Sequence, residues 1–141
     1  MKNIKLMSCL LGSIFSVSAL AEVVVIVNPK NPVSTLTADQ ATSIFLAKTG
    51  EFPSGGGQAV PIDQSEGVAL RDEFYQKSSN RDSAQIKAYW SKIVFTGKGQ
   101  PPKAVANSGE VKKLVAANPN MIGYVDKASV DASVKAVLTL P

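Results

Sequence analysis

Histidine is absent from the sequence, and cysteine occurs only once, at Cys9. A hydrolytic triad needs a histidine base, a thiol enzyme needs a reactive cysteine, and the common zinc sites are built from these two residue types. Cys9 lies in an N-terminal segment that we expect to be removed. The rest of the chain then has no histidine and no cysteine, which excludes a hydrolytic triad, a thiol enzyme and a common zinc site. We therefore predict a protein that is not an enzyme and that holds neither a metal nor another cofactor.

Strong positive charge is lacking as well. The chain has 15 lysines and arginines against 11 acidic residues, a single tryptophan, and no basic run longer than Lys112-Lys113. Proteins that bind nucleic acid normally gather their cations on one face or along one segment. The scattered lysines therefore predict no nucleic-acid partner.

The N-terminal apolar run, residues 6–17, is shorter than the roughly 20 residues that a membrane-spanning helix needs. It follows two lysines and precedes an Ala-Leu-Ala sequence, which together form the pattern of a secretory signal peptide with its cleavage site. Too little of the apolar run precedes Cys9 for this residue to be a lipidation site. We expect residues 1–21 to be a signal peptide, cleaved between Ala21 and Glu22, and the mature protein to be periplasmic.

Cleavage leaves residues 22–141, enough chain for one domain with a core that needs no disulfide. Apolar residues recur there with strand and helix spacing in alternation, which favours an α/β fold. The β-branched run at 23–27 is typical of a strand buried on both faces of a parallel sheet. Further strands are expected at 58–62, 121–125 and 134–140.

Helix starts have local signals in this chain. Thr37 and Gln40 can form a capping box, and Ser108 can cap a later helix. Between them, residues 83–95 are predicted to form the longest helix, with its buried face formed by Ile86, Trp90, Ile93 and Val94. On that helix, Tyr89 and Trp90 have core spacing and are interpreted as packing residues.

The turn between the strand at 58–62 and the next helix contains the sequence Ser-x-Gly. Backbone amides at a helix start have no partner within the helix and carry partial positive charge, so they can hold an anion. Ser65 supplies a hydroxyl there, Gly67 allows close approach to the backbone, and Arg71 lies one turn further on. The alternative is an ordinary helix start, with Ser65 as the N-cap and Arg71 as a solvated surface charge.

Four carboxylates surround this turn, namely Asp63, Glu66, Asp72 and Glu73. They could perform acid–base chemistry or bind a hard cation, but they lack the spacing of a calcium loop. We interpret them as solvated charges around the start of the helix.

Taken in order, the motifs of residues 22–141 resemble the phosphate-binding protein family of ABC importers. The motifs are Leu36-Thr37-x-x-Gln40 with Ile44-Phe45, Ser65-x-Gly67-x-x-x-Arg71-x-x-Phe74, Tyr89-Trp90 with Phe95-Thr96-Gly97 and Pro101-Pro102, and Val115 with Asn118-Pro119 and Ile122-Gly123-Tyr124-Val125. Each motif is weak alone, and the ordered set is specific for the superfamily.

The resemblance implies a type II periplasmic binding-protein fold, in which two α/β lobes hold an anion in the cleft between them. This chain resembles one lobe, with a central, mostly parallel sheet flanked by helices. The residues that correspond most nearly to the family's phosphate-binding helix start are Ser65, Gly67, Val68 and Arg71. Where family members tend to have an arginine and a Ser-Gly-Thr run, this chain has Gln64, Glu66 and Val68, so one cation and one hydroxyl are missing.

Two functions follow from this reading. The first is an exported protein that binds phosphate or a similar oxyanion, like the substrate-binding component of phosphate ABC transport. The alternative is a periplasmic interaction module or sensor accessory that uses the lobe without delivering a ligand. In either case, the face bearing Ser65–Val68 is expected to pair with a second copy or with a membrane protein that completes the cleft.

Overall fold

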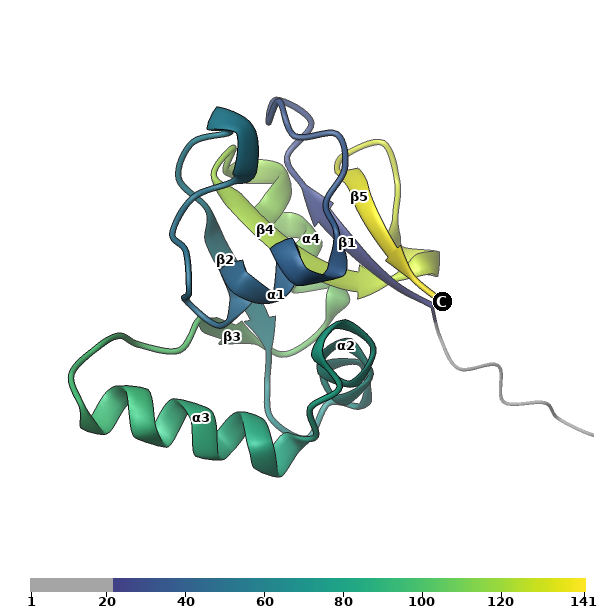
Figure 1. Ribbon diagram of the computed structural model, residues 1–141. Coiled ribbons are helices and arrows are strands. Elements are labelled where there is room, and N and C mark those ends of the chain that lie inside the picture. Colours follow the sequence, from purple (N-terminus) through teal and green to yellow (C-terminus); the bar gives the residue numbers. More distant parts are fainter. Residues whose placement is uncertain (1–21) are drawn as a thin grey trace, which may run out of the picture.

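The computed structural model describes residues 22–141, which form one five-stranded sheet with helices on both faces (Figure 1). The predicted signal peptide lies outside these residues. The strands are β1 (Val23–Val27), β2 (Val60–Gln64), β3 (Lys103–Val105), β4 (Met121–Asp126) and β5 (Lys135–Leu140). The helices are α1 (Ala38–Phe45), α2 (Ala69–Ser79), α3 (Ser83–Phe95) and α4 (Ser108–Ala117), with short 3-10 turns at Pro53–Gly55 and Lys127–Ser129. No helix within residues 22–141 is both long and apolar enough to cross a bilayer.

The strand order is β3-β2-β4-β1-β5, with β2 parallel to both of its neighbours. By contrast, β1 runs antiparallel to both β4 and β5, so four strands share one direction and β1 opposes them. The expected mostly parallel α/β sheet is confirmed, but the prediction that β1 has parallel neighbours is wrong. All five residues of β1 are buried. A continuous apolar run indicates that a strand is buried on both faces, but it does not indicate the direction in which the strand runs.

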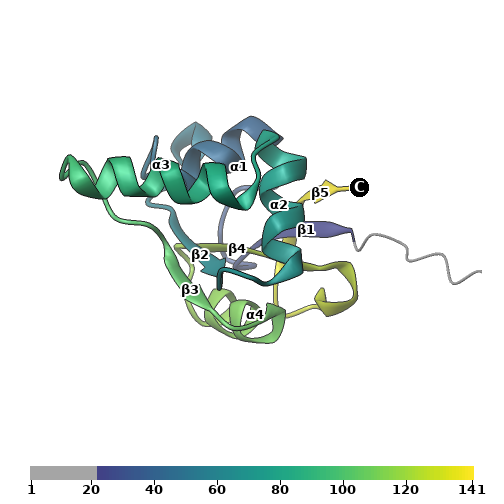
Figure 2. The same ribbon diagram turned by 90° about the horizontal axis from the view of Figure 1, so that it is seen from below.

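Alternate residues of β1 point into two separate hydrophobic layers, because successive side chains of a strand face opposite sides. Val23 and Val25 join the layer beneath α1, α2 and α3, whereas Val24 and Ile26 join the layer beneath α4. Figure 2 shows these helices on opposite sides of the strands. The α4 layer is tight at Gly123, where a Cβ atom would lie 2.3 Å from Cγ1 of Val111, so no side chain fits at this position.

Local capping signals fix two of the helix starts. Thr37 and Gln40 form the predicted capping box of α1, and Asp82 with Gln85 forms a second one that begins α3 at Ser83. The bounds of α3 match the prediction, although Val94, expected in its buried face, is 45% exposed.

The other two helix starts differ from the prediction. Asn107, and not Ser108, caps α4, because its side chain accepts the amide of Glu110. Ser65 does not cap α2, whose N-cap is Val68 with no side-chain hydrogen bond. Strand β2 extends to Gln64, two residues beyond the predicted end, and β3 was not predicted.

Candidate functional site

A cavity of about 460 Å³ lies where the N-terminal ends of α2 and α4 meet. Both helices follow strands of the parallel part of the sheet, so both present their first-turn amides at the same edge. The cavity is lined by Gln64, Val68, Ala69, Leu70, Glu73, Asn107, Ser108, Gly109, Asp126 and Ser129. Two helix ends with unpaired N–H groups give this cavity partial positive charge.

Ser108 supplies the clearest ligand donor in the cavity. Its Oγ accepts hydrogen bonds from Nε2 of Gln64 at 3.3 Å and from the amide of Asp126 at 3.2 Å. A hydroxyl oxygen has two acceptor positions and one proton, so the proton remains for a further partner. Within residues 22–141 that hydroxyl has no acceptor, and an anion in the cavity would provide one.

Gln64 is held in place by a buried carboxylate, Asp63. Oδ1 of Asp63 accepts the amide of Gln64 at 2.7 Å and the hydroxyl of Tyr124. Oδ2 accepts the hydroxyl of Tyr75 at 2.5 Å and Nη1 of Arg71 at 3.2 Å. Asp63 is 1% exposed, so the interpretation of this residue as a solvated charge is wrong. Four donors, one of them charged, compensate for its burial.

The two tyrosines remain neutral donors to Asp63. Burial, followed by the negative charge of Asp63 and the hydrogen bond to it, raises the pKa of Tyr75 and of Tyr124 far above the ordinary tyrosine value. Sequence reasoning missed this cluster. One signal for it was present, since Arg71 and Tyr75 lie four residues apart and therefore on the same face of α2.

Of the four predicted site residues, only Val68 lines the cavity. The hydroxyl of Ser65 donates to the carbonyl of Val105 at 3.2 Å, and Gly67 has a φ of 93°, which favours glycine. Arg71 is not a solvated surface charge. Its Nη1 contacts Asp63 and also donates to the carbonyl of Gln64 at 3.0 Å.

The charged side chains at the cavity are carboxylates. Glu73 and Asp126 line it, and no lysine or arginine of residues 22–141 does. Oδ1 of Asp126 already accepts the amide and hydroxyl of Ser129. Oε2 of Glu73 is buried, accepts no hydrogen bond from a described residue, and has Nζ of Lys77 at 4.0 Å. Residues 22–141 contain no group of three or more acidic, histidine or cysteine side chains that could hold a metal ion.

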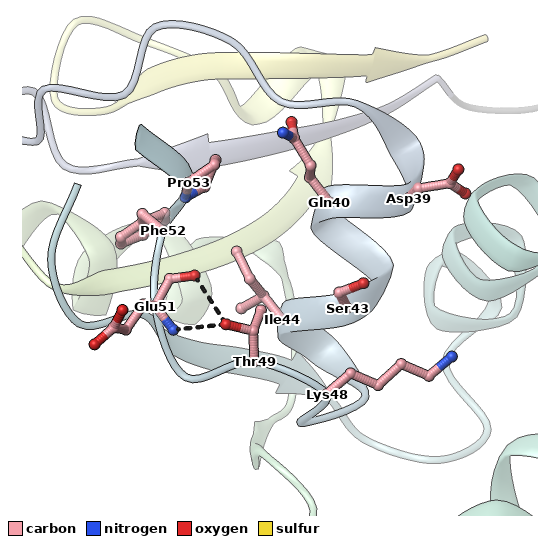
Figure 3. Close-up of a pocket in the computed structure, with 9 residues that line it drawn as sticks. All are labelled: Asp39, Gln40, Ser43, Ile44, Lys48, Thr49, Glu51, Phe52 and Pro53. Atoms are coloured by element: carbon pink, nitrogen blue, oxygen red, sulfur yellow. Dashed lines mark hydrogen bonds between the residues drawn. The ribbon is translucent and has the colours of Figure 1, made fainter. Parts of the chain in front are cut away.

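A second hollow, of about 420 Å³, lies beside α1. Figure 3 shows that Asp39 and Ser43 point to one side of α1 and Gln40 to the other, while Thr49 bonds the backbone of Glu51. Donors that bind one small ligand must converge on it. For this reason we place the candidate site at the ends of α2 and α4.

Comparison with solved structures gives clear matches. A phosphate ABC transporter substrate-binding protein from Clostridium perfringens, solved with bound phosphate, superposes with a TM-score of 0.63 over 83% of this chain at 27% identity. An ABC-type phosphate transport receptor from Vibrio cholerae gives a TM-score of 0.64 at 22% identity, and PstS from Borrelia burgdorferi gives 0.59 at 16% identity, each over 83% of this chain. The structure resembles phosphate ABC transporter substrate-binding proteins.

The match confirms the family resemblance predicted from the sequence motifs and the periplasmic binding-protein fold. For the two proteins with lower identity, the likeness shows the fold alone. The chain spans about half of the length of these proteins, covering 45%, 46% and 47% of the three chains. No family model matches the sequence, and no curated protein matches it.

Proposed function

We propose that this protein is an exported, non-enzymatic binding protein for phosphate or a similar oxyanion, of the kind that serves phosphate ABC transport. The observation that carries the proposal is the hydroxyl of Ser108, which accepts two hydrogen bonds, has no acceptor among residues 22–141, and lies in a cavity that two helix N-termini share. First-turn amides of Ala69, Leu70 and Gly109 supply further donors. The structural neighbour from Clostridium perfringens contains bound phosphate, which supports this ligand class.

The carboxylates at the cavity favour a protonated oxyanion. A carboxylate repels a bare anion, but it accepts a hydrogen bond from an anion that carries a proton. Phosphate is partly protonated at neutral pH, whereas sulfate is not. Glu73 and Asp126 therefore provide a basis for choosing phosphate over sulfate.

The predicted site residues other than Val68 have supporting roles in this proposal. The turn at Gly67, with its positive φ, precedes α2, and Arg71 holds Asp63, which in turn accepts the amide of Gln64. A second copy or a membrane protein that covers the Ser65–Val68 face would exclude water and strengthen the hydrogen bonds to the anion.

Ser108→Ala is expected to weaken phosphate binding by about tenfold to a hundredfold, because it removes a hydrogen bond to a charged ligand. Isothermal titration calorimetry with phosphate measures the change. Ser91→Ala, which removes an exposed hydroxyl on α3, is the matched control and should bind like the unmodified protein.

Ser108 also accepts two hydrogen bonds, so its loss could disturb folding. Glu73→Gln tests the same site with a side chain of the same shape, and the ion pair that it removes, from Oε2 of Glu73 to Nζ of Lys77, is long at 4.0 Å. This variant should bind sulfate more tightly and discriminate less between sulfate and phosphate. Phosphate binding that is unchanged in both variants would place the site elsewhere.

Export is proposed from the signal-peptide pattern of residues 1–21. The expected result is a periplasmic protein whose first residue is Glu22, as measured by intact mass after osmotic release from the expressing cells. A mass that retains Met1, or a lipid on Cys9, would contradict the proposed cleavage between Ala21 and Glu22.

A further inference from the structure

The C-terminal end of α3 projects beyond the sheet and carries Val94 and Phe95, the exposed large hydrophobic side chains of residues 22–141. Figures 1 and 2 both show this end of the helix extending away from the strands before the chain returns to β3. Phe95 is 92% exposed and Val94 is 45% exposed, whereas Ile86 and Trp90, nearer the start of α3, are buried. Val94 and Phe95 are adjacent in the chain, so the end of the helix presents both apolar side chains together to solvent.

Hydrogen bonds hold this tip in a fixed conformation. The amide of Lys98 donates to the carbonyl of Ile93, and the amide of Gly97 donates to the carbonyl of Val94, each at 3.1 Å. Together they form a Schellman cap, in which Gly97 takes the left-handed conformation with a φ of 68°. Phe95 is therefore presented by an ordered helix end rather than by a loose loop.

The segment that contains the tip, from α3 to the start of β3, has charge of one sign only. Residues 83–103 contain four exposed lysines and no acidic residue. These are Lys87, Lys92, Lys98 and Lys103, and none forms an ion pair with another described residue. The acidic side chains of residues 22–141 all lie outside this stretch, where they outnumber the lysines and arginines.

An anionic lipid surface fits these observations better than a protein surface does. A stable protein interface buries about 800 Å² on each partner, whereas one phenylalanine ring offers at most about 200 Å². A small apolar projection with Lys92 and Lys98 three residues before and after Phe95 suits insertion between lipid headgroups, because the ring enters the acyl boundary while the ammonium groups contact the phosphates.

We propose that the end of α3 is a membrane-contact site, at which Phe95 inserts into an anionic lipid surface and Lys92 and Lys98 bind the headgroups. The contact is peripheral and reversible, because one ring and a few lysines give far less binding energy than a spanning helix. This site is separate from the cavity at the ends of α2 and α4. It does not depend on the proposed oxyanion binding.

Vesicle sedimentation of the purified full-chain protein tests the proposal, with the N-terminus defined by intact mass and identical in all variants. Binding is expected to vesicles of phosphatidylglycerol and phosphatidylcholine in equal parts, and to be weak with phosphatidylcholine alone. Phe95→Ala should lower the partition coefficient at least about tenfold. Phe95→Trp should retain binding, and its fluorescence should shift to shorter wavelength when vesicles are added.

The lysines are tested with a matched pair of double variants. Lys92→Gln/Lys98→Gln should lower binding about tenfold to thirtyfold at low salt. Lys30→Gln/Lys113→Gln makes the same change in net charge at two exposed lysines elsewhere and should bind nearly as the unmodified protein does.

Three results would overturn the proposal. The first is equal binding to both kinds of vesicle, and the second is binding that Phe95→Ala leaves unchanged. The third is a dimer, seen by analytical ultracentrifugation, that Phe95→Ala converts to a monomer while the unmodified protein binds no vesicles, since a second copy would then occupy the tip.

Discussion

Asp63→Asn is expected to lower the free energy of unfolding by about 3–5 kcal/mol, the usual cost of removing one partner from a buried charged network. The amide presents a donor where the carboxylate accepts, so at least one of Tyr75, Tyr124 and Arg71 loses its acceptor. Urea denaturation followed by circular dichroism measures the change.

Glu51→Gln is the matched control, because it makes the same chemical change at an exposed carboxylate and should shift stability by less than about 0.5 kcal/mol. Tyr75→Phe removes a single donor and should cost about 1–2 kcal/mol, so the cluster can be examined even if the Asp63 variant does not fold. A loss below about 1 kcal/mol for Asp63→Asn would show that the buried network does not stabilise the fold.

Phe74→Ala is expected to cost a similar amount, about 3–5 kcal/mol, because it opens a cavity at the centre of the larger hydrophobic layer. Phe74 is fully buried, with its ring stacked on Tyr124 at a centroid distance of 4.1 Å and edge-on to Phe45 at 4.8 Å. The loss of the stacked ring also frees Tyr124, which holds Asp63 through its hydroxyl.

Phe95→Ala makes the identical substitution at the exposed end of α3 and should leave the unfolding free energy within about 0.5 kcal/mol of the original value. The pair therefore separates the two roles of phenylalanine in this chain, since Phe74 acts in folding and Phe95 in surface contact. Equal destabilisation by both substitutions would contradict the assignment of Phe95 to a solvent-facing tip.

The proposed oxyanion site joins features that differ in how far the sequence could predict them. The helix-start hypothesis pointed to the turn before α2, because a strand, a Ser-x-Gly sequence and an amphipathic helix are all local patterns. Of the residues predicted there, Val68 lines the cavity. Ser108 was noticed only as a possible cap, since its partner Gln64 lies 44 residues away in the chain.

The sequence by itself determined the alternation of strands and helices, the capping box of α1, the extent of α3, and the ordered motifs that resemble the phosphate-binding proteins. These features depend on residues within a few positions of one another, and local hydrogen bonds or hydrophobic periodicity decide them. Only the tertiary structure decided the direction of β1, because burial on both faces is the same for either direction. The tertiary structure alone also decided that Asp63 is buried. Its carboxylate oxygens accept the hydroxyls of Tyr75 and Tyr124, which lie 12 and 61 residues further along the chain. A carboxylate is a surface charge or a buried anchor according to the donors that the fold brings to it, and those donors are too distant in sequence to form a local pattern.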